Sequence, residues 1–310
     1  MPRNWIKGGC LVLNSIYILL LTSILSGMFT MLSPKQLDQF KTDGYTVIEN
    51  VLSPEHLAQM KTRAAGIVNE WKEDADNPIF TTKDNNRSNN NYFLNSAENI
   101  SCFYEEEAFD ANGEFVQKRE DCINKIGHAL HELDPTFQTI SHLPLLGEIA
   151  KDLGLEQPEL RQSMYIFKQP RIGGVVNWHQ DATFFYSDPI SVITFWFAIE
   201  DATLENGCLW VEPKGHLGPL RERFNRDDNI TTMDALDDTP WPTESGVPLE
   251  VKAGTLVCFH GKLPHYSAPN RSDKSRQAYT LHVTDGRCHY AESNWLQTKT
   301  LPLRGFDIID

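Results

Sequence analysis

The sequence predicts a mainly β protein of the α+β class, in which helices buttress a β-barrel core. From about residue 158 onward, short β-rich runs alternate with Gly, Pro, Asn and Asp, a pattern typical of the many short strands of a sandwich or barrel. Before that point the apolar residues recur at helical spacing, and no flexible linker separates the two parts. We therefore expect one domain over residues 31–310, with helices packed against the barrel.

Two helices are expected at the start of this domain. Ser33 precedes Pro34 and is followed by Gln36, which completes a capping box, and Gly44 ends the first helix. Residues 45–48 then form a β-rich run. The second helix opens at Ser53-Pro54, and its apolar face consists of Leu57, Met60, Ala64, Ile67, Val68 and Trp71.

The next segments mix expected helices with expected loops. Residues 121–153 are expected to be helical and to be broken at Pro135 and Pro144, with one apolar face formed by Ile123, Ile126, Ala129, Leu130 and Leu133. Residues 81–91 are a polar, Asn-rich loop. The acidic stretch between Arg226 and Val247 is long enough to be a functional loop, and we expect a lid there.

The expected strands lie in the second half of the chain. They are the runs at 160–168, 191–200, 207–213, 248–254, 255–261 and 277–283. Their β-branched and aromatic residues suit a pleated, half-buried surface, and each run is bounded by turn residues.

Charge and cysteine content exclude some classes of protein. The net charge of −14 argues against a nucleic-acid partner, because phosphate binding needs a basic surface. The six cysteines are scattered without CxxC spacing, so neither a zinc knuckle nor a disulfide scaffold is indicated. Cys208 and Cys258 sit in apolar runs and are expected to be buried and reduced, which favours a reducing, cytoplasmic location.

The first 30 residues suggest a different cellular location. Arg3 and Lys7 precede an apolar run from Leu11 through Phe29, the pattern of a signal peptide or signal anchor. The alternative is that translation begins at Met31. We expect membrane contact, or a place in the secretory pathway, only if this leader is retained.

The triplet His179-Gln180-Asp181 is the first half of a candidate metal site. Strand alternation puts residues 179 and 181 on one face, and His265 follows several strands later. Two imidazoles and one carboxylate occupy one face of an iron(II) octahedron and leave three positions open, as in non-haem iron oxygenases. A double-stranded β-helix would bring the early pair and the late histidine together. His260 is the competing ligand.

Ser267 and Arg276 follow the second histidine closely. An arginine forms bidentate pairs with carboxylates, so these two residues are candidates to hold the remote carboxylate of 2-oxoglutarate. The alternative for Arg276 is a surface salt bridge, and Arg271 is a nearby competitor. The remaining histidines singled out are expected to be turn, packing or surface groups: His128, His131, His216 and His282.

A basic cluster leaves two interpretations open. Lys214, Arg221, Arg223 and Arg226 lie close together in the sequence and are interrupted by acidic residues. They could meet a phosphate-bearing substrate, but a solvated face is the preferred interpretation.

Several long segments carry a resemblance to a known family. They are CINKIGHALHELDP, QSMYIFKQP, the HQDA that begins at His179, EDATLENGCLW and SDKSRQAYTLHV. From Met31 to about residue 300, the chain resembles the phytanoyl-CoA dioxygenase family. The resemblance implies a double-stranded β-helix with helical buttresses, bound iron(II), and 2-oxoglutarate as cosubstrate.

The resemblance also implies roles for single residues. By position, His179, Asp181 and His265 match iron ligands, while Ser267 and Arg276 match the groups that hold the distal carboxylate of 2-oxoglutarate. Three further positions match residues around the cosubstrate: Lys125, Met164 and Trp196. Without the resemblance, Lys125 reads as an exposed helix lysine, and Met164 and Trp196 read as core packing. Related halogenases lack the carboxylate at the position of Asp181, so its presence argues for oxygenation.

The expected function is that of a 2-oxoglutarate-dependent non-haem iron dioxygenase. It would convert 2-oxoglutarate and dioxygen to succinate and carbon dioxide and hydroxylate a substrate, either an acyl-CoA-like or other small molecule or a peptide side chain. Two alternatives stay open: a non-catalytic metal- and 2-oxoglutarate-binding module, and a zinc-type hydrolase that uses the same three ligands.

Overall fold

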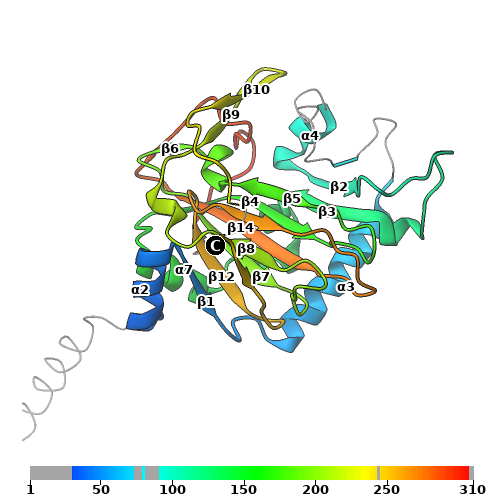
Figure 1. Ribbon diagram of the computed structural model, residues 1–310, viewed down its shortest axis with the longest axis horizontal. Helices are drawn as coiled ribbons and strands as arrows, with labels where there is room; N and C mark the ends of the chain where they lie inside the picture. Colours follow the sequence, from blue (N-terminus) through cyan, green and yellow to red (C-terminus); the bar gives the residue numbers. More distant parts are fainter. Residues whose placement is uncertain (1–29, 73–78, 81–90, 243–244, 307–310) are drawn as a thin grey trace, which may run out of the picture.

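The computed structural model describes residues 30–72, 79–80, 91–242 and 245–306 (Figure 1). The expected leader, apart from Thr30, and residues 81–90 of the Asn-rich loop lie outside these ranges. Within the described ranges, no helix combines the length and the apolar character needed to cross a membrane.

A large antiparallel sheet forms one wall of the barrel. Its seven strands lie in the order β1 (Tyr45–Ile48), β12 (Leu256–His260), β7 (Ile193–Ala198), β14 (Ala278–Asp285), β4 (Pro158–Ile166), β3 (Ile123–His128) and β2 (Ile100–Tyr104). The central strands are the most deeply buried, and every residue of β7 and β14 is shielded from solvent. Such strands are covered on both faces, which explains their nearly continuous apolar sequence.

A smaller antiparallel sheet forms the facing wall. Its order is β11 (Val247–Leu249), β8 (Leu209–Val211), β13 (His265–Ser267) and β5 (Val176–His179). Side chains from both sheets line one shared cavity, so the two sheets face each other. The prediction of a mainly β fold with a double-stranded β-helix core is confirmed.

Alternation along the large sheet separates its two faces. On β7, Phe195 and Phe197 pack into the main apolar core with Met60, Phe137 and Ile149 of the helices. The intervening residues of β7, Thr194 and Trp196, line the cavity instead. The helices therefore cover one face of the large sheet, and the cavity lies on the other.

The five buttressing helices are α2 (Pro34–Asp43), α3 (Pro54–Glu70), α5 (Leu130–Leu133), α6 (Pro135–Ser141) and α7 (Pro144–Asp152). Four of them begin where the sequence predicts; α5 begins later, after a strand. Both expected N-caps are present, at Ser33 and Ser53, each with a reciprocal capping box. Gly44 ends α2 at φ 84°, and a Cβ there would lie 2.4 Å from Nδ1 of His216, so a residue without a side chain is required.

Short elements complete the described chain. They are α4 (Asn91–Asn95), β6 (Ser187–Asp188), β15 (His289–Tyr290), the hairpin strands β9 (Glu222–Asp227) and β10 (Ile230–Ala235), and 3₁₀ turns at Ser96–Glu98, Arg119–Cys122, Asp181–Thr183 and Gly215–Leu217. In Figure 1 the hairpin β9–β10 projects at the top, whereas α2 and α3, in blue, lie on the side of β1.

Two expectations about local structure were wrong. Residues 123–128 form strand β3 and not the start of a helix; all of them except Asn124 are buried, so the strand shows no alternation that would reveal it. The segment between Arg226 and Val247 is not an open loop throughout, because β9 and β10 pair along their whole length. The buried, unpaired thiols of Cys208 and Cys258 agree with the expectation for those two residues.

Candidate active site

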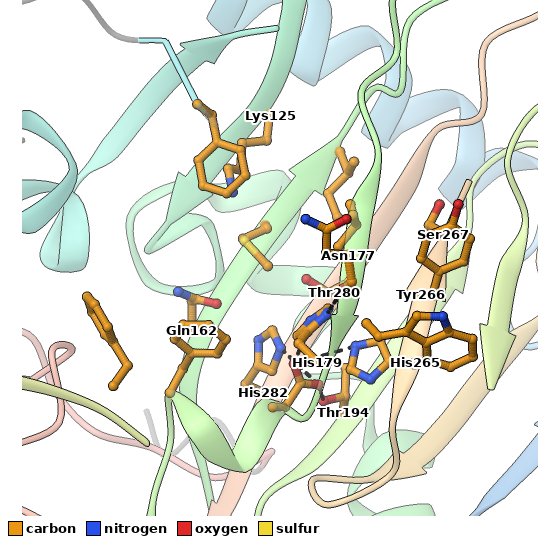
Figure 2. Close-up of a pocket in the computed structure, with 18 of the residues that line it drawn as sticks. Lys125, Gln162, Asn177, His179, Thr194, His265, Tyr266, Ser267, Thr280 and His282 are labelled. Carbon is orange, nitrogen blue, oxygen red and sulfur yellow. Dashed lines mark hydrogen bonds and ion pairs between the residues drawn. The ribbon is translucent and has the colours of Figure 1, made fainter. Parts of the chain in front are cut away.

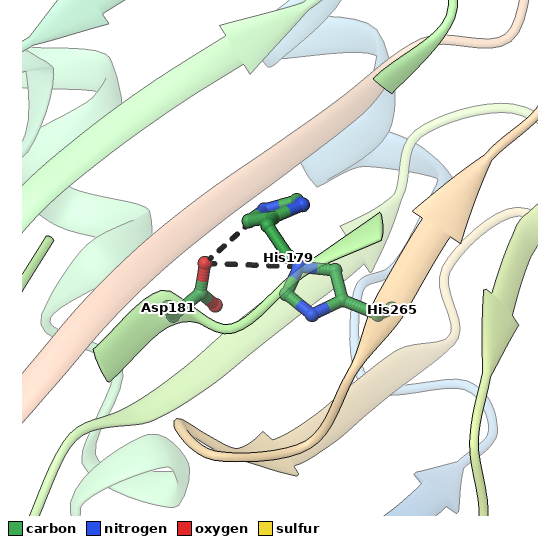
Figure 3. Close-up of side chains that lie close together, drawn as sticks. All are labelled: His179, Asp181 and His265. Carbon is green, nitrogen blue, oxygen red and sulfur yellow. Dashed lines mark ion pairs between the residues drawn. The ribbon is translucent and has the colours of Figure 1, made fainter. Parts of the chain in front are cut away.

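Three side chains far apart in the sequence meet at one end of the cavity. His179 is the last residue of β5 and lies directly opposite His265, the first residue of β13. Asp181 begins the 3₁₀ turn that follows β5. Oδ1 of Asp181 lies 3.5 Å from Nε2 of His179 and 3.7 Å from Nε2 of His265 (Figure 3). The donor atoms all lie within 4.8 Å of one another, close enough for a small contraction to place them around one ion.

The segment from His179 to Asp181 is not one continuous strand, contrary to the expectation from the sequence. Strand β5 ends at His179, so Asp181 is not on the same strand. Gln180 nevertheless stays extended, with φ −121° and ψ 132°, and this keeps both flanking side chains on one side. Gln180 itself is fully buried, and its amide donates to the carbonyls of Pro219 and Lys262. Gln180 therefore fixes the backbone between His179 and Asp181.

Backbone carbonyls orient both imidazoles. Nδ1 of His179 lies 2.8 Å from the carbonyl oxygen of Asn177, and Nδ1 of His265 lies 3.0 Å from that of Leu263. A carbonyl only accepts, so each Nδ1 carries the proton and each Nε2 presents its lone pair toward Asp181. This fixed tautomer is the one that metal-binding histidines use.

Electrostatics favour an ionised Asp181 and a neutral His265. Burial lowers the pKa of His265 to about 4, and the neighbouring His179 adds to the effect. Burial alone would raise the pKa of Asp181, but the neighbouring His265 and His282 hold it well below the usual value. A buried carboxylate of this kind is costly to maintain alone and fits a divalent cation.

Two residues that the sequence did not identify as part of the site hold the other oxygen of Asp181. Thr194 on β7 donates its hydroxyl to Oδ2, and Nε2 of His282 on β14 lies 3.5 Å from the same atom. Figure 2 shows both side chains beside His179 and His265. His282 was expected to be a packing or surface group; it is 3% exposed and stacks on Phe185, so it does pack in the interior, and it contacts Asp181 as well.

Arg276 and Ser267 form a second, cationic feature of the same cavity. Arg276 is 2% exposed; its Nη2 donates to Oγ of Ser267 over 3.1 Å, and its Nε donates to the carbonyl of Gly207. Among the described residues nothing accepts a hydrogen bond from Nη1. Burial lowers the pKa of Arg276 to about 10, so the side chain is still charged at neutral pH. An unpaired nitrogen on a buried cation fits the carboxylate of a ligand.

The remaining predicted residues line the same cavity. Trp196 lies on β7, with its ring centre 5.5 Å from the guanidinium carbon of Arg276. Met164 lies on β4 beside Thr280 of β14. Lys125 is 6% exposed on β3 and places its ammonium over the ring of Phe80. Its interpretation as an exposed helix lysine is therefore wrong.

The competing candidates lie elsewhere. His260 packs beside His216, with ring centres 5.5 Å apart. Arg271 forms a surface pair with Glu107. These positions leave His265 and Arg276 as the residues that face the cavity.

The basic cluster is not the solvated face that the sequence suggested. Arg221 is buried against Glu212 and the ring of Trp241. Arg223 lies over Tyr186, and Arg226 donates to backbone carbonyls. Of the four residues, Lys214 alone is exposed. The three arginines therefore hold neighbouring segments together.

The cavity extends from the triad toward the hairpin β9–β10. It has a volume of about 700 Å³, within the range of pockets that enclose one small molecule. Its walls away from Arg276 are largely aromatic and apolar: Phe93, Phe184, Phe185, Phe224, Met233, Trp241 and Trp295. The segment expected to act as a lid thus supplies part of the wall, through Thr231, Thr232 and Met233.

Comparison with known proteins agrees with this architecture. The model of the phytanoyl-CoA dioxygenase family matches residues 40–278. The chain is 44% identical to a phytanoyl-CoA dioxygenase of Arabidopsis thaliana, over 89% of this chain and 97% of that protein. It is 41% identical to the mouse phytanoyl-CoA dioxygenase domain-containing protein 1, over 87% of this chain and 97% of the mouse protein.

Solved structures share the fold at low identity. The non-haem α-ketoglutarate-dependent carbocyclase SnoK superposes with a TM-score of 0.62 at 19% identity, covering 88% of this chain and 97% of SnoK. EctD from S. alaskensis, solved with 2-oxoglutarate and 5-hydroxyectoine, gives 0.60 at 19% identity, covering 87% of this chain and 85% of EctD. The matched family model and the extent of the identities lead to one conclusion: this chain belongs to the phytanoyl-CoA dioxygenase family.

Proposed function

We propose that the chain is an iron(II)- and 2-oxoglutarate-dependent dioxygenase that hydroxylates a small-molecule substrate. One observation carries the proposal: a single cavity contains both the triad of His179, Asp181 and His265 and the buried pair of Arg276 and Ser267. A zinc-type hydrolase would use the triad but would leave the buried arginine without a role. A dioxygenase of this kind uses both.

The donor set supports iron(II) as the metal. Two imidazole nitrogens and one carboxylate oxygen form the facial set of non-haem iron oxygenases, and that set leaves positions open for other ligands. Bound there, iron(II) supplies the activation of dioxygen, and 2-oxoglutarate supplies two electrons as it becomes succinate and carbon dioxide. The chain's own task at this end is to keep both Nε2 atoms and Asp181 in place, through the carbonyls of Asn177 and Leu263.

The buried arginine supports 2-oxoglutarate as the cosubstrate. Within the described residues, Nη1 of Arg276 donates to no acceptor. Ser267 accepts from Nη2 and donates its own hydroxyl to the carbonyl of Gly207, so it holds the guanidinium in place. A carboxylate beside Nη1 would accept from it and would neutralise the buried cation. Trp196 and Met164 would pack on the carbon chain of this cosubstrate, with Lys125 on the same cavity wall.

The walls of the cavity support an apolar substrate. Aromatic rings surround the space between the triad and the hairpin, and they exclude water from the reacting atoms. The acyl part of an acyl-CoA-like molecule, or another apolar small molecule, suits such walls. A peptide side chain is the other candidate that fits the same space.

The direct test is iron-dependent formation of succinate from 2-oxoglutarate by the purified chain. Asp181→Ala should abolish it, because one of three metal ligands is lost. Arg276→Ala should raise the KM for 2-oxoglutarate about 100-fold, since a buried bidentate partner of a carboxylate is removed. Arg271→Ala is the matched control, because that arginine is paired on the surface, and it should leave the KM unchanged.

Two outcomes would contradict the proposal. Turnover that survives Asp181→Ala would show that the triad is not the reacting centre. Tight binding of iron and 2-oxoglutarate without succinate, over a panel of acyl-CoA and apolar small molecules, would instead indicate a non-catalytic binding module.

A further inference from the structure

The two oxygens of Asp181 have different neighbours. Oδ1 faces Nε2 of both His179 and His265, and Figure 3 shows both ion-pair lines meeting at this one oxygen. Oδ2 accepts a hydrogen bond from the hydroxyl of Thr194 and lies 3.5 Å from Nε2 of His282. The first oxygen is thus directed to the position of the metal, and the second is directed away from it into the large sheet.

Thr194 and His282 are well placed to hold Oδ2. They lie opposite each other on β7 and β14, and they are 1% and 3% exposed. The ring of His282 stacks on Phe185 with centres 4.5 Å apart, which fixes its plane. An ionised carboxylate can only accept, so both neighbours present a hydrogen to it. Hydrogen bonds to a buried charge are among the stronger ones in proteins.

The number of oxygens that Asp181 gives to the metal decides what else can bind there. Two imidazoles and one carboxylate oxygen leave three positions of an octahedral ion open. A chelating cosubstrate occupies two of them, and one remains for dioxygen. If Oδ2 also bound the metal, the chelator would fill the last two positions and no place would remain for the gas.

We propose that Thr194, assisted by His282, is a positioning residue that holds Oδ2 away from the metal by a hydrogen bond. Asp181 then binds the metal through one oxygen only. A two-oxygen chelator and a diatomic gas can then bind the metal at the same time. This inference rests on the proposed function only in taking the triad as the iron site. It assigns to Thr194 control over how many positions stay open, and not over whether the metal binds.

The test compares Thr194→Val, which has nearly the same shape without a hydroxyl, with Thr194→Ser, which retains the hydroxyl. Each protein is loaded with iron(II) without oxygen and is exposed to nitric oxide, whose iron complex gives an EPR signal. Oxalate serves as the chelator, because it needs two adjacent positions and does not need Arg276. The wild-type chain and Thr194→Ser should keep the nitric oxide signal when oxalate is saturating.

Thr194→Val should behave differently in only one condition. Without oxalate it should bind nitric oxide like the wild type, since two positions remain open even if Asp181 chelates. With oxalate, its signal should fall about tenfold or more, the size set by the loss of a hydrogen bond to a charged acceptor.

Three results would overturn the inference. They are a Thr194→Val protein that holds both ligands as the wild type does, one that loses the signal even without oxalate, and a wild-type chain in which oxalate displaces nitric oxide. Because oxalate binding does not require turnover, the proposed function can fail separately. A chain that shows the expected Thr194 pattern but forms no succinate would contradict the dioxygenase activity alone.

Discussion

The two sheets of the barrel contribute different things to the site. The small sheet supplies the two metal-binding histidine candidates, His179 on β5 and His265 on β13, at directly opposite positions. The large sheet supplies no member of the triad. It supplies the groups that hold Asp181, namely Thr194 and His282, and the ring of Trp196 beside the buried arginine. One sheet therefore presents donor atoms, and the other fixes their surroundings.

This division follows from how each sheet is packed. The large sheet is covered by helices on one face and borders the cavity on the other, and its central strands β7 and β14 are buried throughout. The small sheet has shorter strands, of three or four residues, whose outer side chains are only half-buried. Its histidines are fixed mainly by carbonyls of their own chain segments. Substitutions in the two sheets should therefore damage different steps.

The largest effect is expected in the small sheet. His265→Asn should weaken iron(II) binding by about 100-fold or more, because a direct ligand is lost. His260→Asn is the control, since His260 is partly buried but packs beside His216. Metal titration followed by calorimetry would measure both affinities. Equal losses in the two variants would mean that the histidines contribute through folding and not as ligands.

An intermediate effect is expected in the large sheet. Trp196→Leu should raise the KM for 2-oxoglutarate about tenfold and leave iron binding unchanged, because the ring lies near the guanidinium of Arg276. Its neighbour Phe195 faces the helices. Phe195→Leu should instead lower the free energy of unfolding by about 1–2 kcal/mol without a change in KM. If the two substitutions had the same effect on KM, the assignment of faces along β7 would be wrong.

The smallest effect on the metal and cosubstrate is expected outside both sheets. Met233 on the hairpin strand β10 lines the far wall of the cavity. Met233→Ala should change the iron affinity and the KM for 2-oxoglutarate by no more than about twofold, because Met233 belongs to neither the triad nor the pair of Arg276 and Ser267. The same variant should alter which apolar substrates increase succinate formation. A large change in iron affinity would show that the hairpin and the triad are coupled.

Local rules were enough to predict the elements that form by themselves. The capping box of Ser33 and Gln36 and the helix start at Ser53-Pro54 involve residues close in the sequence, so they can be read from it. The strands from residue 158 onward are marked by β-branched runs and turn residues. For the triad, local rules reached only as far as pairing His179 with Asp181 on one face; the preference for His265 over His260 came from the resemblance to the family.

Sequence periodicity failed to predict a strand that is buried on both faces. In β3, Ile123 and Ile126 lie three positions apart, as on a helix, but the strand is buried on both faces and has no alternating pattern. His282 carried a usable signal, because it lies six residues after Arg276 and therefore on the same face of the run. Thr194 carried none. Its contact with Asp181 depends on pairing between strands that the sequence does not specify.

The opposition of His179 and His265 across β5 and β13 has a consequence for how the chain folds. Asp181 is anchored by the large sheet and the histidines stand on the small one, so the three donors converge only when the barrel has closed. An ion held there would bind the native chain and not the unfolded one, and would shift the folding equilibrium toward the closed form. The metal would thus stabilise the contact between the two sheets. The metal content of a preparation would then report the fraction of correctly folded molecules.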